Sequence, residues 1–179
     1  DHLKAYGIAF WSLKLKKDVN WLLNYRGGSF LLEESKKTIN EMTIRGVYFE
    51  RLNASQLGEV YSTIDENNMD IVLLEKSPKI AVYSPPDKQP WDDAVTLALT
   101  YAEIDYDVVF DDEVLNDQLN DYDWLHLHHE DFTGQYGKFY KNYRNSSWYR
   151  KMENDFKSTA SRYGFDSVPD LKKNIAQKI

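Results

Sequence analysis

The chain has 179 residues, of which 42% are hydrophobic and 28% are charged, a balance typical of one globular domain. Its formal charge of -7 argues against a nucleic-acid partner, because phosphates are bound by basic patches. No apolar stretch approaches the roughly 18 residues of a membrane helix, and the lack of cysteine excludes disulfides, thiolate metal sites and cysteine nucleophiles.

Hydrophobic spacing predicts helices and strands that follow one another along the chain. In the first half, we expect helices at 1–15, 31–46 and 53–68, and strands at 18–24, 47–52 and 70–75. In the second half, we expect strands at 79–84, 106–110 and 123–129, and helices at 90–101, 133–143, 146–164 and 167–179, with a short helix or turn at 112–122.

This alternation predicts one α/β domain over residues 1–179. Strands separated by helices of 10–16 residues favour a three-layer α/β/α arrangement, of the flavodoxin-like kind, around a mostly parallel sheet. In such sheets ligands bind beyond the carboxyl ends of the strands. Three polar or glycine-rich segments, 24–30, 84–93 and 128–137, follow predicted strands, and we expect them to share one edge.

The first of these segments contains Arg26, Gly27, Gly28 and Ser29, between a predicted strand and a predicted helix. Two glycines let backbone N–H groups approach an anion, and Arg26 adds a positive charge. The alternative is a tight turn in which Ser29 caps the next helix. The spacing matches no nucleotide-binding motif. In the second segment, Trp91 is a candidate for closing over a pocket, although a tryptophan at a helix start more often covers the core.

Three of the four histidines lie where the predicted strand 123–129 runs into the third segment, in the sequence His126-Leu127-His128-His129-Glu130-Asp131. His126 lies inside the apolar run and is expected to be a hydrogen-bonded core or ligand-binding residue. Four further candidates lie at or past the strand end: His128, His129, Glu130 and Asp131. Their imidazole and carboxylate groups are suitable ligands for Zn, Mn or Fe.

Three interpretations of this segment stay open. His128, His129 and Asp131 would be the metal ligands of a metal-dependent hydrolase, with Glu130 beside them. Alternatively, His128, Glu130 and Asp131 would serve acid–base catalysis or, with His129, bind a ligand by hydrogen bonds. The third interpretation is structural capping. The sequence itself indicates no cofactor and no oligomeric state.

Aromatic residues gather near the C-terminus. Tyr136, Phe139, Tyr140 and Tyr143 recur at helical spacing, which is more typical of a core than of a binding platform. If Tyr140, Tyr143, Trp148 and Tyr149 were exposed instead, they would favour a surface that contacts protein or glycan.

Several long motifs resemble a family of uncharacterised bacterial proteins that is commonly labelled asparagine synthetase B. They are "HLKAYGIAFWSL", "WLLNYRGGSF", "LEKSPKIAVYSPP", "PWDDAVTLALTYAEI" and "YDWLHLHHEDFTGQYGKF". The resemblance covers nearly the whole chain. It implies relatives with a leader peptide and further C-terminal sequence, and therefore a periplasmic or envelope location, with the cytoplasm as the alternative.

Asparagine synthetase chemistry has no motif in this chain. Glutamine hydrolysis by such enzymes needs an N-terminal cysteine, and their ATP site needs an S-G-G-x-D-S loop; both are absent. Residues 79–129 also resemble the opening units of the class I glutamine-amidotransferase-like fold, without its cysteine nucleophile. The combined expectation is a non-catalytic or degenerate amidotransferase-like domain that binds a small molecule or a protein at the carboxyl edge of the sheet.

Overall fold

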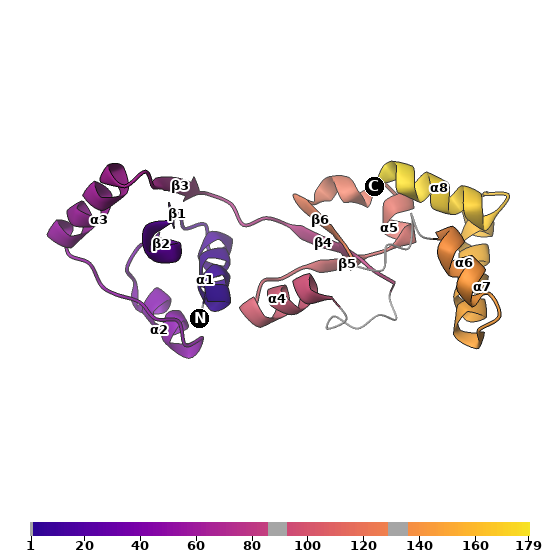
Figure 1. The fold of residues 1–179 in the computed structure, drawn as a ribbon, viewed down its shortest axis with the longest axis horizontal. Helices are drawn as coiled ribbons and strands as arrows, with labels where there is room; N and C mark the ends of the chain where they lie inside the picture. Colours follow the sequence, from indigo (N-terminus) through magenta and orange to yellow (C-terminus); the bar gives the residue numbers. More distant parts are fainter. Residues whose placement is uncertain (1, 86–92, 129–135) are drawn as a thin grey trace. The chain divides into compact units, whose positions relative to one another are not determined.

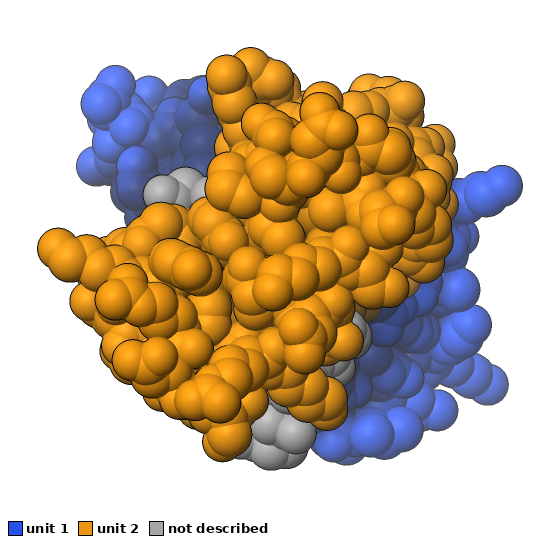
Figure 2. All heavy atoms as spheres, turned by 90° about the vertical axis from the view of Figure 1, so that its right-hand side faces the viewer, with its two compact units in different colours: residues 1–77, 97–105 blue, residues 78–96, 106–179 orange. Residues whose placement is uncertain are grey.

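A computed structural model of the chain describes residues 2–85, 93–128 and 136–179. The chain divides into two compact units (Figures 1 and 2). Unit 1 comprises residues 1–77 and 97–105, and unit 2 comprises residues 78–96 and 106–179. Within the described residues, no helix combines the length and the apolar character needed to span a bilayer.

Unit 1 contains a three-stranded antiparallel sheet with the order β2-β1-β3. Its elements are α1 (His2–Lys14), β1 (Val19–Leu23), η1 (Tyr25–Gly27), β2 (Ser29–Leu32), α2 (Lys36–Ile44), α3 (Ala54–Glu66) and β3 (Asp70–Leu74). In the central strand, Trp21 lies opposite Phe30 of β2 and Val72 of β3.

The central strand of unit 1 is covered on both faces. Val19 packs with Ala9 and Leu13 of α1, whereas Leu22 packs with Val60 and Ile64 of α3. Because successive side chains of a strand point to opposite faces, the odd spacing between Val19 and Leu22 places α1 and α3 on opposite sides of β1.

Unit 2 contains a three-stranded parallel sheet with the order β5-β4-β6. Its elements are β4 (Ile80–Tyr83), β5 (Asp107–Val109), α5 (Asp111–Leu115), η3 (Gln118–Asp121), β6 (Trp124–Leu127), α6 (Tyr136–Tyr143), α7 (Ser147–Arg162) and α8 (Val168–Lys178); α4 (Ala94–Ala102) begins in unit 2 and ends in unit 1. In register, Val82 of β4 lies beside Val108 of β5 and His126 of β6.

One face of the parallel sheet forms the main core of unit 2. Ala81 and Tyr83 of β4 belong to a buried cluster with residues of β5, α5, α7 and α8, namely Val109, Val114, Ala160, Leu171 and Ile175. The alternate side chains, Val82 and His126, point to the other face. Tyr83, the last residue of β4, therefore marks where the apolar core meets the carboxyl edge of the sheet.

The sequence correctly predicts a mixed α/β protein and nearly every element, but two local predictions are wrong. Residues 47–52, expected as a strand, have no regular secondary structure. Leu31 and Leu32, expected at the start of a helix, belong to β2. Parallel pairing holds for the sheet of unit 2, and the sheet of unit 1 is antiparallel.

Candidate functional site

The segment from Arg26 to Ser29 closes a hairpin between antiparallel β1 and β2, and the prediction that it joins a strand to a helix is wrong. Gly27 and Gly28 have φ angles of 80° and 101°, which favour glycine. Their N–H groups donate to carbonyl oxygens of the same turn, at 3.4 and 2.9 Å. This geometry favours the tight-turn interpretation over an anion cradle.

The guanidinium of Arg26 is engaged at the surface of unit 1. It donates to Oε2 of Glu50 over 3.0 Å, and the Tyr48 hydroxyl donates to Oε1 of the same carboxylate over 2.9 Å. The two donors, Tyr48 first, hold the pKa of Glu50 below its usual value. Arg26 was predicted to share an edge with the segments that follow β4 and β6, because the carboxyl ends of parallel strands meet at one edge of a sheet. Since β1 belongs to a different sheet from β4 and β6, this argument does not apply to Arg26.

His126 lies on the α4 side of the parallel sheet, where its Nε2 atom is 3.0 Å from Oδ1 of the buried carboxylate of Asp93. The same oxygen accepts the N–H groups of Val95 and Thr96 at 2.8 and 3.1 Å, so Asp93 also caps α4. The expectation of a hydrogen-bonded, mostly buried His126 is confirmed. A carboxylate on one ring nitrogen fixes the orientation of the imidazole.

His128 follows β6 directly and is buried, and its N–H donates to the Tyr83 carbonyl over 3.1 Å. This bond continues the pairing of β6 with β4, so His128 lies at the carboxyl edge as predicted from the sequence. The other candidates, Trp91, His129, Glu130 and Asp131, lie outside the described residues. Among those described, no three histidine, aspartate or glutamate side chains form a group that could hold a metal ion.

A cavity of about 920 Å³ opens in unit 2 at the carboxyl ends of β4 and β5. Ser84 and Pro85 follow β4 and line it, and Phe110 does so after β5. The first turn of α5 and one side of α6 and α7 complete the wall with Asp111, Asp112, Glu113, Phe139, Tyr143, Trp148, Lys151, Met152, Asp155, Phe156 and Thr159. The cavity therefore combines aromatic and charged side chains at the edge where ligands of parallel sheets bind.

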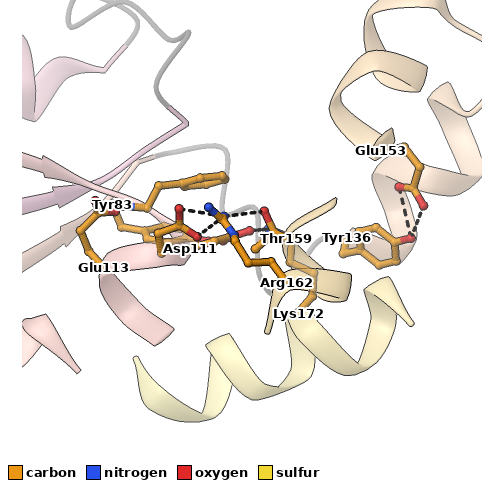
Figure 3. A network of polar contacts seen from close by, with 10 residues as sticks. Tyr83, Asp111, Glu113, Tyr136, Glu153, Thr159, Arg162 and Lys172 are labelled. Carbon is orange, nitrogen blue, oxygen red and sulfur yellow. Dashed lines mark hydrogen bonds and ion pairs between the residues drawn. The ribbon is translucent and has the colours of Figure 1, made fainter. Parts of the chain in front are cut away.

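A buried ion pair, which was not predicted, includes Asp111 of this lining (Figure 3). Nζ of Lys172, on α8, is 2.7 Å from Oδ2 of Asp111, and the Tyr83 hydroxyl donates to Oδ1 over 2.7 Å. Burial lowers the pKa of Lys172, and the negative charge of Asp111 opposes this shift. A signal existed in the sequence: Lys172 shares the apolar face of α8 with Val168 and Ile175.

The outer wall of the cavity is a row of aromatic side chains on α6 and α7. The ring centroids of Phe139 and Tyr143 are 5.8 Å apart, and those of Tyr143 and Trp148 are 5.2 Å apart. Tyr143 is 41% exposed and Trp148 is 51% exposed, and α6 has no fully buried residue. The expectation that this stripe forms core is therefore wrong.

The base of the aromatic row is fixed by Glu153 of α7. The Tyr136 hydroxyl donates to its carboxylate over 3.0 Å (Figure 3), and the Tyr149 ring is fully buried beside it. Burial, and next the negative charge of Glu153, raise the pKa values of both tyrosines. The hydrogen bond from the uncharged Tyr136 hydroxyl to Glu153 thus links α6 to α7.

Comparisons of the chain with models of protein families, with curated proteins and with solved structures found no match. The resemblances to the asparagine synthetase B-labelled family and to the amidotransferase-like fold therefore stay predictions from the sequence.

Proposed function

We propose that this chain binds a small molecule, without transforming it, at the carboxyl edge of the β5-β4-β6 sheet. The observation that carries the proposal is the cavity of about 920 Å³, whose lining begins with the residues that follow β4 and β5. Its size suits a small organic ligand, and its mixture of rings and a few charged groups is typical of such sites.

The strand order also supports a ligand site at the carboxyl edge of this sheet. If β4, β5 and β6 are counted as the first, second and third strands, their order across the sheet is second, first, third. The first three strands of a flavodoxin-like sheet have the same order. In that arrangement the strand order reverses between the first and third strands, β4 and β6, and ligands bind at the carboxyl edge beside that point. The cavity lies at the same edge, on the β5 side of β4. The polar segments at 84–93 and 128–137 follow β4 and β6 in the sequence, so Trp91, His129 and Glu130 remain candidates for contacts with the ligand.

The finer proposal is a degenerate amidotransferase-like domain, in a protein of the bacterial envelope. It is supported by the order of the parallel strands and by the absence of cysteine from the sequence. His126 and Asp93 would then orient the loops through the capped start of α4 rather than activate a nucleophile.

A fragment screen by ligand-observed NMR tests the binding site. Thr159 lines the cavity, so Thr159→Trp is expected to fill it, whereas the preceding residue on α7, Ser158, is exposed and lies outside the lining. Fragments should bind the wild type and Ser158→Trp, lose binding to Thr159→Trp, and be recovered chemically unchanged. Fragments that bind all three proteins equally would contradict the proposed site, and turnover would contradict the non-catalytic role.

A glycan is the second candidate occupant, because Tyr140, Tyr143 and Trp148 are exposed. Tyrosine and tryptophan offer a flat apolar face together with a polar group, which suits sugar rings. Tyr149, the fourth aromatic residue considered from the sequence, is buried and does not belong to this surface.

A further inference from the structure

The charges that line the cavity are unbalanced. Of its four carboxylates, Asp111 is neutralised by Lys172, and Asp112 accepts two hydrogen bonds from Arg162 at 2.6 and 2.8 Å. Two carboxylates then remain, Asp155 and Glu113, of which Glu113 already accepts the N–H of Phe110 with Oε2 over 2.9 Å. Lys151 is the one cation in the described lining. The balance of charge therefore favours a positively charged occupant over an anionic one.

The inner wall of the cavity already holds an ammonium group. Nζ of Lys172 lies 3.7 Å from the centroid of the Phe156 ring and 4.9 Å from that of Phe110, with the Asp111 carboxylate 2.7 Å away. Phe156, Phe110 and Asp111 all line the cavity as well. The fold thus stabilises one ammonium between aromatic faces and a carboxylate at this edge.

The outer wall offers the same chemical groups to solvent. Trp148 and Tyr143 are in contact and half exposed, and Trp is the aromatic residue that attracts cations most strongly. Asp155 lies two turns after Trp148 on α7, and both residues line the cavity. Rings and a carboxylate on the same wall match the two requirements of an organic cation, an electron-rich face and a negative counter-charge.

We propose that the ligand of this cavity is an organic ammonium compound, held between the rings of Trp148 and Tyr143 and the carboxylates of Asp155 and Glu113. This inference rests on the proposed function, because it assigns the class of ligand to the same site. A neutral sugar would use the rings but would gain little from the excess of carboxylates.

Isothermal titration calorimetry at low ionic strength tests the class of ligand with three probes: choline, its uncharged isostere 3,3-dimethylbutan-1-ol, and N-acetylglucosamine. Choline should bind more tightly than the isostere, and added salt should weaken it because the attraction is electrostatic. Trp148→Ala and Asp155→Asn should each weaken choline binding by about twofold to thirtyfold, the range expected for one cation–π or charge contact. The matched controls are Trp124→Ala and Asp166→Asn, which replace exposed residues of unit 2 outside the cavity lining.

The possible outcomes separate the two proposals. Equal binding of choline and its isostere, or binding of N-acetylglucosamine alone with dependence on Trp148, would overturn the ammonium assignment and leave the small-molecule site standing. Absence of choline binding would also overturn the assignment. The proposed function itself fails if the fragment screen finds no ligand whose binding Thr159→Trp abolishes, or if a bound fragment is turned over.

Discussion

Lys172 and Asp111 form an ion pair that is almost completely buried, with side-chain exposures of 2% and 4% and an Nζ–Oδ2 distance of 2.7 Å. The pair joins α8 to the first turn of α5 (Figure 3), and its Asp111 lines the cavity. Removing one member leaves the other charged group buried without its counter-ion, which typically costs about 3–5 kcal/mol.

The first prediction concerns this pair. Asp111→Ala should lower the free energy of unfolding by about 3–5 kcal/mol in urea titrations. Lys172→Met should also destabilise, because the Tyr83 hydroxyl is then the one remaining hydrogen-bond partner of the Asp111 carboxylate within the described residues. The double variant Asp111→Ala/Lys172→Met should lose less than the sum of the single losses, since no charge stays buried.

Lys173→Met is the matched control for this prediction, because Lys173 is the exposed neighbour of Lys172 on the same helix. It should change the stability by no more than about 0.5 kcal/mol. Strict additivity of the two single variants would show that the ion pair does not couple α8 to α5.

The second prediction compares two glycines inside helices. A Cβ atom on Gly7 of α1 would lie 1.8 Å from the carbonyl oxygen of Ala102, whereas one on Gly58 of α3 would meet nothing within 4 Å. Gly58→Ala should therefore stabilise the protein by about 0.5–1 kcal/mol through helix propensity. Gly7→Ala should destabilise it by about 1–3 kcal/mol despite the same gain in propensity, because the packed backbone must move. Chemical denaturation measures both, and equal effects would contradict the close contact.

The third prediction concerns the cap of α4. Asp93→Ala removes an acceptor of the N–H groups of Val95 and Thr96 and should cost about 0.5–2 kcal/mol. Asp93→Asn keeps a carbonyl oxygen in the same place and should cost less, because asparagine caps helices well. Thermal unfolding followed by circular dichroism distinguishes the two variants. Equal losses would show that the contact with His126, and not the cap, is what stabilises this region.

Local signals in the sequence predicted the helices well because they act within a few residues. Asn53 or Ser55 was expected to cap α3, and Asn53 is the cap, in a capping box with Gln56. Gly46 was expected to end a helix, and it has a φ angle of 67° just after α2. Such motifs depend on the backbone of the same turn, so distant residues do not alter them.

The two wrong predictions of secondary structure have one cause. A strand forms its hydrogen bonds with another segment of the chain, and its own residues do not show which segment that is. Residues 47–52 alternate like a strand but pair with no strand in the part of the chain that the structure describes, and Tyr48 remains 79% exposed. The turn at Arg26 looked like a strand-to-helix connection because the apolar pair Leu31 and Leu32 fits either element. Alternation shows which side chains share a face and does not show which segment pairs with them.

The sequence predicted where the candidate site lies but not the cavity that forms it. The carboxyl edge of a parallel sheet, His126 and His128 followed from the sequence, because strand ends can be read from hydrophobic runs. The cavity could not be predicted in this way, since its wall depends on how α5, α6 and α7 are arranged. Tyr140 and Tyr143 had the spacing of core residues, yet both are exposed in the structure.

The last prediction concerns acid pH and unit 1. Glu103, just after α4, accepts a hydrogen bond from Nζ of Lys4 over 2.7 Å and lies 3.4 Å from Nε of Arg45. The hydrogen bond from Lys4 and, to a smaller extent, the charge of Arg45 lower the pKa of Glu103 below its usual 4.5. The folded chain therefore binds this proton less readily than the unfolded chain, so the contribution to stability is complete above pH 4.5 and is lost as the pH falls through the lowered value.

Glu103→Gln should remove this part of the acid sensitivity. Because the Glu103 side chain is 48% exposed, solvent screening limits the effect to about 0.2–1 kcal/mol near neutral pH. Urea unfolding of the wild type and the variant should differ at pH 7 and converge at low pH. Glu66→Gln, at the exposed end of α3, should follow the wild-type curve throughout. A difference that persists unchanged at low pH would show that Glu103 stabilises unit 1 through packing and not through its charge.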